Sequence, residues 1–382
     1  MIREYITYLP AVPGRIEEEW KQCLEQITER LNAGTRPIKL NIFTDTPDYP
    51  SFIKIKEYIK KSVFDSFGDS CPALNVTIHP PEKPWKVSVE GLFVTAEKPG
   101  ITTKLYHSHP YVIIESESSK EIWGAGLGND IYWKDTRKAA NTAFDSIVDI
   151  LDTEGLSLNN LVRQWNYIGN ILEVKNGLQN YQVFNEVRSE YYGKYRTIPG
   201  YPAATGVGMK FGGVYLDFCA IKAKDKIKIK PIDNPNQLNA YEYGQHVLKG
   251  SSGKGKSLKH PPQFERALMI MNGSNRNLFI SGTASIKGQE TIGKGDIKEQ
   301  TIVTIENIKK LTDPERINQI MGESDSVPGR YSLLRIYIKN QKDFEAVKSI
   351  CTEHFSKVPA SYIEADICRD DLLTEIECEF VI

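Results

Sequence analysis

The strongest constraint on the fold is a pattern of segments that occurs three times along the 382 residues. In each copy, a stretch with the periodicity of an amphipathic helix is followed by a short apolar stretch typical of a strand. The predicted helix and strand are residues 16–31 and 38–44 in the first copy, 137–151 and 161–168 in the second, and 298–311 and 332–339 in the third. Such a repeat predicts one supersecondary unit that is built three times.

Each copy continues in the same order. A second helical stretch comes next, then a Pro-Ala pair, and then a β-rich stretch that carries an acidic residue. The helical stretches begin near Phe52, Phe184 and Phe344, the Pro-Ala pairs are residues 72–73, 202–203 and 359–360, and the acids are Glu90, Asp217 and Glu375. A unit of this kind would form a small mixed sheet with helices on one face and bury its other face against its neighbours. We therefore expect an α+β fold that is pseudo-trimeric within one chain, and a monomer or weak oligomer.

This pattern divides the chain into four parts. Residues 1–90 are predicted to form a degenerate first unit, residues 91–230 the first full unit, and residues 265–382 the C-terminal unit. Residues 231–264 are rich in Pro, Gly, Ser and Lys and show neither helical nor strand periodicity, which predicts a connecting loop. Long loops inside compact proteins are often functional, so this segment is a candidate lid over a site.

Composition narrows the class of partner. The net charge of -1 argues against nucleic-acid binding, which needs a concentrated basic face. No stretch approaches the ~20 apolar residues of a membrane span, and charges occupy the place of a signal peptide's apolar run. The cysteines lack CxxC spacing, so neither disulfides nor a structural zinc site is predicted. We expect a cytoplasmic protein with a small-molecule ligand.

Three motifs that suggest a cofactor or metal have better explanations. Residues 250–257 match the phosphate-loop pattern, but the prolines at 261–262 exclude the helix whose N-terminus would hold phosphate. The glycines of residues 124–128 (GAGLG) lack the spacing of a dinucleotide fingerprint and are interpreted as a turn. His107 and His109 have no identifiable third metal ligand. No cofactor and no metal site are predicted.

The C-terminal strand carries the most informative cluster of charges. Glu375, Glu377 and Glu379 alternate with apolar residues, so the three acids share one strand face. That face is either solvated or lines a cleft between units, where burial and like charge would raise a carboxyl pKa as a general acid requires. Arg188 and Arg335 could each bind a substrate carboxylate through two N–H groups, or form an ordinary surface ion pair.

Several segments resemble known families. Similarity to a RidA/YjgF domain, with its chorismate mutase-like fold, covers about residues 265–382 and rests on residues 278–286 (LFISGTASI), Gln300, 306–308 (ENI) and 375–377 (EIE). Similarity to the chorismatases runs from about residue 85 onward and rests on residues 163–167 (RQWNY), 185–188 (NEVR), 202–208 (PAATGVG), 234–243 (NPNQLNAYEY) and 264–267 (FERA).

The chorismatase resemblance implies cleavage of the enolpyruvyl ether of chorismate, with release of pyruvate and no cofactor. On this resemblance Glu375 is the catalytic acid. Cys368 matches the cysteine of members that form 3-hydroxybenzoate, so we expect this product rather than a dihydroxycyclohexadiene carboxylate or 4-hydroxybenzoate. A doubly anionic substrate needs cationic or hydroxyl partners when it is buried. The residues expected to bind it are Arg188, Arg335, Tyr201, Thr205, Tyr243 and Ala284.

Two other functions stay open. One is a RidA-like enamine/imine deaminase, but those enzymes carry an arginine directly after the Pro-Ala pair, and the three copies here have Leu74, Ala204 and Ser361. The other is a non-catalytic small-molecule-binding protein of the same fold, because a fold does not determine a function. Gln289 is a further departure, since the chorismatase pattern has a histidine there.

Overall fold

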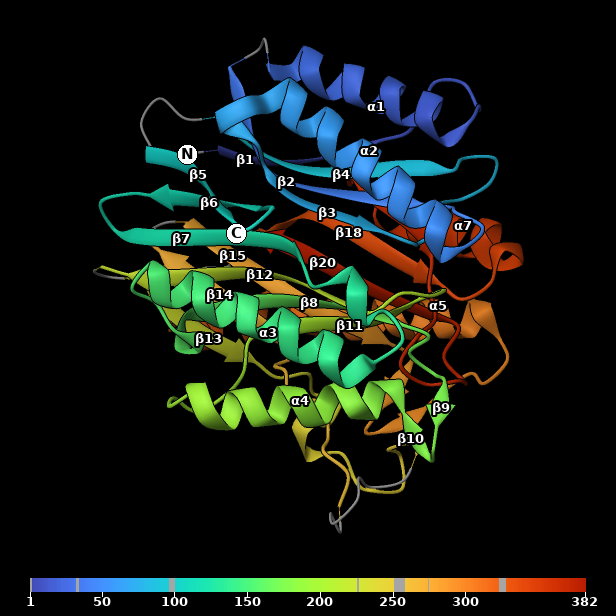
Figure 1. The fold of residues 1–382 in the computed structure, drawn as a ribbon. Helices are drawn as coiled ribbons and strands as arrows, with labels where there is room; N and C mark the ends of the chain where they lie inside the picture. Colours follow the sequence, from blue (N-terminus) through green and yellow to red (C-terminus); the bar gives the residue numbers. More distant parts are fainter. Residues whose placement is uncertain are drawn as a thin grey trace.

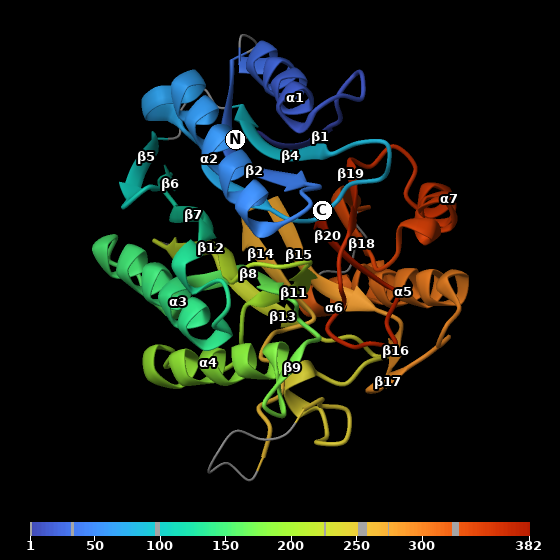
Figure 2. The ribbon, with the colours of Figure 1, turned by 45° about the vertical axis from the view of Figure 1, so that its right-hand side comes forward.

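The structure is a computed structural model that describes residues 2–31, 34–95, 100–224, 227–250, 258–273, 275–322 and 328–382. Within these residues the strands form three main sheets of four, six and six strands, with helices on their outer faces (Figure 1). Figure 2 shows the helix pairs α1 and α2, α3 and α4, and α5 and α7 at the periphery, with the sheets between them.

The first sheet has the strand order β1-β4-β2-β3. Its elements are β1 (Ile2–Tyr8), α1 (Ile16–Leu31), β2 (Thr35–Thr44), α2 (Tyr49–Phe67), β3 (Ala73–Thr77) and β4 (Val87–Thr95). The N-terminus of α2 is capped by the side chain of Asp48, which accepts a hydrogen bond from the N–H of Ser51, and Pro50 lies in the first turn. Both helices bury apolar side chains such as Trp20 and Phe52 against this sheet.

The second sheet has the order β11-β8-β12-β7-β6-β5. Its elements are β5 (Gly100–Tyr106), β6 (His109–Glu115), β7 (Ser119–Leu127), α3 (Thr136–Thr153), β8 (Leu161–Gly169), α4 (Asn180–Tyr195), β11 (Ala203–Met209) and β12 (Val214–Ala223), with the short ribbon β9 (Val174–Lys175) and β10 (Leu178–Gln179) before α4. Phe144 of α3 and Phe184 of α4 stack in the apolar layer beneath these helices.

The third sheet has the order β13-β14-β15-β20-β18-β19. Its elements are β13 (Lys228–Ile232), β14 (Ala267–Asn272), β15 (Asn275–Ala284), α5 (Ile297–Leu311), α6 (Pro314–Met321), β18 (Arg330–Ile338), α7 (Phe344–His354), β19 (Ala360–Glu364) and β20 (Thr374–Val381), with the ribbon β16 (Ile286–Lys287) and β17 (Glu290–Thr291) before α5. Ile376, Cys378 and Phe380 of β20 face the apolar layer under the helices, as their alternation predicts.

The three sheets share one core topology. In each, two parallel strands joined through a helix lie beside an antiparallel strand: β3-β2-β4, β11-β8-β12 and β19-β18-β20. The Pro-Ala pairs mark the starts of β3, β11 and β19. The predicted α+β class, with mixed sheets and helices on one face, is therefore confirmed, and the shared topology supports the predicted pseudo-trimer. The oligomeric state stays a prediction.

The inner faces of the sheets meet in a ring of buried ion pairs. Each pair joins two different sheets, so the ring connects the first sheet to the second, the second to the third and the third to the first. The pairs are Lys39–Asp217, Arg163–Glu377 and Arg335–Glu90. The sequence pattern grouped Glu375 with Glu90 and Asp217 as the recurring acids. The structure instead gives the third place in the ring to Glu377, so Glu375 is an additional acid.

The glycine-rich residues 124–128 do not form the predicted turn. Gly124 and Gly126 lie within β7, where a side chain at Gly124 would overlap the ring of Phe218. Gly126 has a φ of +62°, and its N–H donates a hydrogen bond of 2.8 Å to the carboxylate of Asp217. The β7–β12 ladder shifts its register beside these residues, as in a β-bulge. These glycines permit close approach rather than a change of chain direction.

Three further features concern the predicted segments. The first sheet extends past the expected boundary at residue 90, because β4 ends at Thr95. In the connection between β13 and β14, the described residues 233–250 and 258–266 contain one short 3-10 helix, Ala240–Glu242. Most of the phosphate-loop pattern, residues 251–257, lies outside the described residues.

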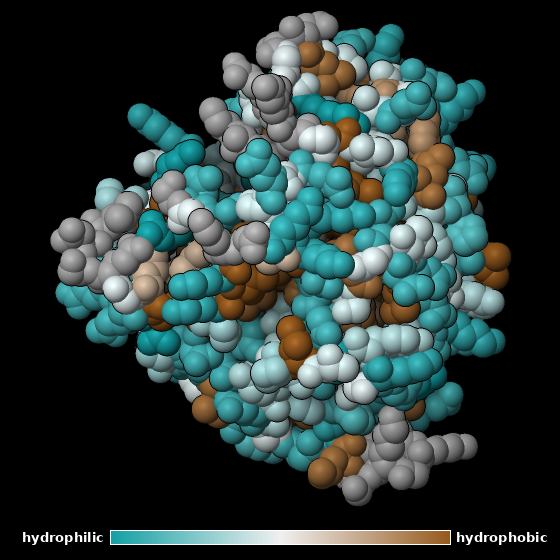
Figure 3. All heavy atoms as spheres, turned by 90° about the vertical axis from the view of Figure 1, so that its left-hand side faces the viewer, coloured by the Kyte–Doolittle hydropathy of each residue, from teal (hydrophilic) through white to brown (hydrophobic). Residues whose placement is uncertain are grey.

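The outer surface is mainly hydrophilic on the face drawn in Figure 3, where hydrophobic side chains occur in small separate groups. Among the helices of the described ranges, none combines the length and apolar character required to cross a bilayer.

Candidate active site

A cavity lies where the second and third sheets meet, and its empty space of about 440 Å³ includes part of the open solvent at its mouth. The second unit contributes α4 and β11, and the third unit contributes β15, β16, β20 and the loop before β20. The long connection that leads to β14 closes one side. The lining residues used below are Tyr181, Ala204, Tyr243, Arg266, Gly282, Ala284, Cys368, Arg369 and Glu375.

Glu375 provides the cavity with a proton donor. It lies on β20 between Ala284 of β15 and Tyr337 of β18, and its side chain is 5% exposed. Burial raises the pKa of Glu375 to about 8, and the negative charge of Glu377 contributes further. At neutral pH this carboxyl is therefore protonated, which is the state that a general acid needs.

A β-bulge in β15 makes room for the Glu375 carboxyl. The β15–β20 ladder shifts its register between Ile280 and Thr283, which frees the backbone of Gly282 from strand pairing. Its N–H donates instead to the hydroxyl of Thr205 on β11, at 2.9 Å. Any Cβ at position 282 would overlap the carboxyl oxygen of Glu375. A glycine is therefore required where this carboxyl packs against the bulge.

Cys368 and Tyr181 lie at the same cavity and are both neutral. Burial raises the pKa of the Cys368 thiol to about 12, and the charge of Glu375 adds to this effect. Burial likewise raises the pKa of Tyr181 above its ordinary value. The cavity therefore presents the thiol of Cys368, the phenol of Tyr181 and the carboxylic acid of Glu375 as possible proton donors.

Arginines supply positive charge around the cavity. Arg266 and Arg369 lie over the ring of Tyr243, with guanidinium carbons 5.5 and 5.0 Å from its centroid. Arg369 donates from Nη1 to the backbone carbonyl of Gln289 at 2.7 Å. Its Nη2 is buried and has no hydrogen-bond partner in the described part of the chain, and neither has the Nε of Arg188. A buried guanidinium N–H without a partner is costly, and a bound carboxylate would satisfy it.

The structure brings together four of the predicted site residues. Glu375, Cys368, Tyr243 and Ala284 all line the cavity. Thr205 lies beneath it, where its hydroxyl contacts Gly282.

The other three predicted residues lie farther from the cavity. Arg188 is hydrogen-bonded to Tyr181, so it contacts the lining from behind. Tyr201 stacks on Tyr192 at 5.7 Å, outside the lining. Arg335 belongs to the central ring, where both Glu90 and Glu377 bind its guanidinium. We therefore do not include Tyr201 and Arg335 in the proposed substrate contacts.

Three lining residues with polar or charged side chains were missed from the sequence. Arg266 lies in the segment 264–267 that carried the chorismatase resemblance, and Arg369 directly follows Cys368, so both were within reach of that comparison. Tyr181 lies at the start of α4 in a segment without any motif. Its place at the cavity follows only from the fold, which brings its ring next to Gly206 of β11.

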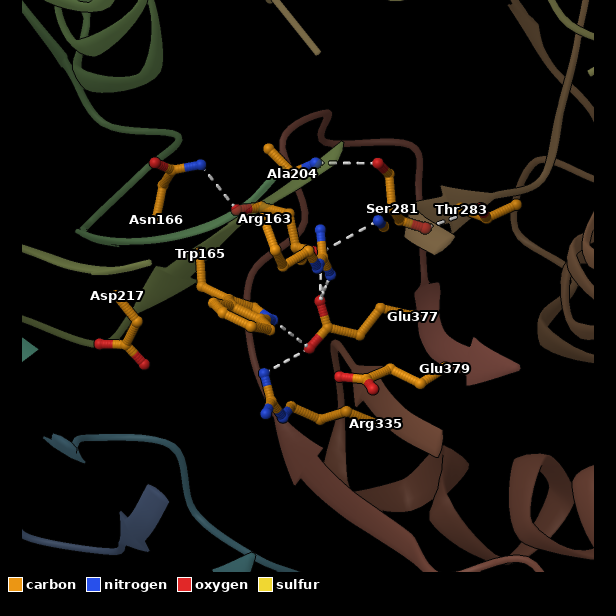
Figure 4. A network of polar contacts seen from close by, with 12 residues as sticks. Arg163, Trp165, Asn166, Ala204, Asp217, Ser281, Thr283, Arg335, Glu377 and Glu379 are labelled. Carbon is orange, nitrogen blue, oxygen red and sulfur yellow. Dashed lines mark hydrogen bonds and ion pairs between the residues drawn. The ribbon is translucent and has the colours of Figure 1, made fainter. Parts of the chain in front are cut away.

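Glu377 lies two residues beyond Glu375 on the same strand face but is in the opposite protonation state. Figure 4 shows its carboxylate between Arg163, Trp165 and Arg335. Burial alone would raise the pKa of Glu377, but the charges of Arg335 and Arg163 hold it below the ordinary range. The paired Glu377 is therefore ionised, whereas Glu375 keeps its proton.

Gln289, which departs from the family pattern, does not line the cavity. Its side-chain oxygen accepts a hydrogen bond of 2.8 Å from the N–H of Gly244, next to Tyr243. Its backbone carbonyl accepts the bond from Arg369. Gln289 thus holds the long connection, and with it Tyr243, against the third unit.

Comparison with known proteins adds to this geometry. Residues 112–220 match the family model described as "Chorismatase FkbO/Hyg5-like, N-terminal". A chorismatase from Streptomyces rapamycinicus is 30% identical over 290 residues, which are 69% of this chain and 82% of that protein. A 3-hydroxybenzoate synthase from Streptomyces hygroscopicus is 30% identical over 250 residues, which are 63% of this chain and 68% of that protein.

Two further matches concern the fold. A RutC family protein from Saccharolobus solfataricus is 32% identical over 103 residues, which are 26% of this chain and 74% of that protein. A crystal structure of a chorismatase has a TM-score of 0.69 to this structure at 21% identity, and covers 99% of this chain and 98% of its own. The two chains therefore share a fold along nearly their whole length.

Proposed function

This chain belongs to the chorismatase family, and on that premise we propose that it cleaves the enolpyruvyl ether of chorismate, releases pyruvate and forms 3-hydroxybenzoate. The observation that carries the proposal is a protonated carboxyl, Glu375, in a cavity bordered by a buried arginine N–H without a partner. The cavity thus combines an acid with a place for a carboxylate.

Glu375 would transfer its proton to the terminal methylene carbon of the enolpyruvyl group. Protonation at this carbon produces a cationic, oxocarbenium-like centre on the ether, which weakens the bond to the ring and lets the side chain leave as pyruvate. The step needs an acid with a pKa near the working pH, and burial gives Glu375 such a pKa, about 8.

The carboxylates of chorismate need partners at the same time. Arg369 lines the cavity, and its Nη2 has no hydrogen-bond partner among the described residues, so it is suited to bind one carboxylate. Arg188 lies behind Tyr181, so it acts on a bound carboxylate through this phenol and through its charge. Arg266 donates its hydrogen bonds to Leu238 and Tyr243 and acts mainly through its charge. Two buried carboxylates without such partners would each cost several kcal/mol.

We propose 3-hydroxybenzoate as the ring product because Cys368 lies in the cavity. Its neutral thiol lies in the cavity with Glu375, and the similarity to a 3-hydroxybenzoate synthase is consistent with this product. Conversion of chorismate to 3-hydroxybenzoate and pyruvate redistributes the substrate's own atoms and consumes no water. Hydrolysis to a dihydroxycyclohexadiene carboxylate would instead consume one water molecule.

The deaminase alternative is not favoured. The residue after the Pro-Ala pair, Ala204, lines the cavity, so this position does reach the site. A RidA-like deaminase would have an arginine there, and the methyl group of Ala204 cannot replace it.

The first test is a coupled pyruvate assay with chorismate, together with identification of the ring product by mass spectrometry and NMR. We expect equal amounts of pyruvate and 3-hydroxybenzoate. A dihydroxycyclohexadiene carboxylate or 4-hydroxybenzoate would overturn the proposed product and retain the family reaction. No pyruvate release from chorismate would overturn the proposed function itself.

Replacing Gly282 by alanine should reduce pyruvate release by about 100-fold, because a small misplacement of a reacting group can cost that much. The added methyl would overlap the Glu375 carboxyl and displace it from the cavity. Gly193→Ala on α4 is the matched control, since a Cβ there meets no neighbour within 4 Å. Equal kcat/KM values for the two variants would contradict the role assigned to Gly282.

A further inference from the structure

The three glutamates of the β20 inner face, Glu375, Glu377 and Glu379, are all affected by the charge of one arginine. Arg163 of β8 donates from Nη2 to the carboxylate of Glu377 and to the hydroxyl of Thr205, the latter at 2.7 Å. Its Nη1 is buried and has no hydrogen-bond partner within the described ranges. The charge of Arg163 also acts on Glu375, where it lowers the pKa and opposes the effect of burial. The charge of Arg163 therefore acts on both Glu375 and Glu377, but its ion pair is with Glu377.

Thr205 connects this arginine to the bulge that supports Glu375. Its hydroxyl accepts hydrogen bonds from Arg163 and from the N–H of Gly282, and it donates to Glu377. The Glu375 carboxyl packs directly against Gly282. The position of Arg163 and the position of the proposed acid are thus coupled through one hydroxyl group.

We propose that Glu377 is a positioning residue for the proposed reaction, which binds the guanidinium of Arg163 and so prevents it from pairing with Glu375. This inference rests on the proposed function. If Glu377 lost its charge, Arg163 would keep a buried positive charge and an Nη1 without a partner in the described part of the chain. Its charge already acts on Glu375 and on Glu379, and Glu379 is bound by Tyr5, which leaves Glu375 to pair with it. An ion pair with Arg163 would ionise Glu375 and remove the proton that the reaction requires.

Other charged and titratable groups face these two acids from the neighbouring elements, and they remain in place in the variants below. Around Glu375 they are Tyr181, Arg266, Cys368 and Arg369, and around Glu377 they are Lys39, Glu90, Tyr167, Arg335 and Tyr337.

The test uses the pH dependence of kcat/KM for pyruvate release. In the wild type the rate should fall as the pH rises through about 8, because Glu375 then loses its proton. Glu377→Gln should move this fall to lower pH by about one unit or more, because it removes a negative charge that raises the pKa of Glu375 and lets the opposite charge of Arg163 pair with it. Glu379→Gln is the matched control on the same strand face, since Glu379 binds Tyr5 and not Arg163. The kcat/KM of Glu379→Gln should fall at the same pH as that of the wild type.

Arg163→Gln gives the opposite prediction and covers the case in which Glu377→Gln does not fold. Removing the cation leaves Glu377 paired with Arg335 and should move the fall to higher pH. In the double variant Arg163→Gln/Glu377→Gln, the pH at which kcat/KM falls should return towards that of the wild type. A merely structural role of either residue would lower the rate at every pH without shifts of opposite sign.

A spectroscopic titration separates this inference from the proposed function. The C=O stretch of the protonated Glu375 carboxyl can be followed by infrared spectroscopy in the substrate-free protein, and the band is identified by its loss in Glu375→Gln. If the wild type released no pyruvate, the proposed function would fail, yet this band should still titrate at lower pH in Glu377→Gln and at higher pH in Arg163→Gln. A band that titrates at the wild-type pH in both variants would overturn the inference.

Discussion

Replacing Glu375 by glutamine should reduce kcat for pyruvate release by about 10²- to 10⁴-fold, the range typical of a lost general acid. Glutamine has nearly the same shape and can still contact Gly282, but its amide cannot protonate the enol ether. Because Glu375 is protonated at neutral pH, the substitution changes no charge there. Chorismate should therefore still bind, and KM should change much less than kcat.

The same variant makes a prediction about stability. Burial raises the pKa of Glu375 above that of the unfolded chain, so the wild type loses stability as the pH rises from the unfolded value, near 4.5, through about 8. Glu375→Gln removes this penalty. Its thermal midpoint should match the wild type at low pH and exceed it above pH 8. Pyruvate release at the wild-type rate, by a variant with a native circular dichroism spectrum, would refute the role of Glu375 as the acid.

The repeat could be predicted from sequence because each unit buries an apolar stripe against its own sheet. The predicted helix 16–31 coincides with α1, and 137–151 and 298–311 lie within α3 and α5. These periodicities reflect local packing, which a sequence records directly. The predicted turn at residues 124–128 was wrong because these glycines are required by close contacts with other strands, which the local sequence does not record.

The site could be predicted only in part, because its chemistry depends on how the units meet. Alternation placed Glu375, Glu377 and Glu379 on one face, yet nothing in the sequence separates the proton donor from the ion-paired acid. That difference arises from Arg163 and Arg335, which belong to other strands and, of these three acids, pair only with Glu377 in the described part of the chain. For Arg335 the sequence left open a substrate contact or an ordinary surface ion pair. Its place in a buried ring could not be inferred from its own segment.

The ring also explains how the junction of the second and third sheets can supply a proton donor. At the other two junctions the ring acids are bound by cations, since Lys39 pairs with Asp217 and Arg335 with Glu90. At the junction of the second and third sheets the ring uses Glu377, and the neighbouring Glu375 is left without an ion pair. The additional acid on β20 therefore lets this junction hold the ring together and still supply a proton donor.

Arg335→Met should destabilise the protein by about 3–5 kcal/mol, because removing one partner of a buried ion pair leaves an uncompensated charge. Arg335 is 1% exposed and binds both Glu90 and Glu377, whereas Glu377 retains Arg163 after the change. The main cost therefore falls on Glu90, whose remaining partner is the amide of Asn41 at 2.9 Å. The loss should appear as a lower midpoint in urea unfolding followed by circular dichroism.

The matched control is Arg15→Met, which removes an arginine from the exposed pair with Glu18 and should leave the urea midpoint near that of the wild type. The double variant Arg335→Met/Glu90→Leu should recover part of the lost stability, because it replaces the whole buried pair by apolar groups. If Arg335→Met were as stable as the control, the ring would not hold the three units together. If the double variant were less stable than Arg335→Met, the cost would come from lost packing and not from the unpaired charge of Glu90.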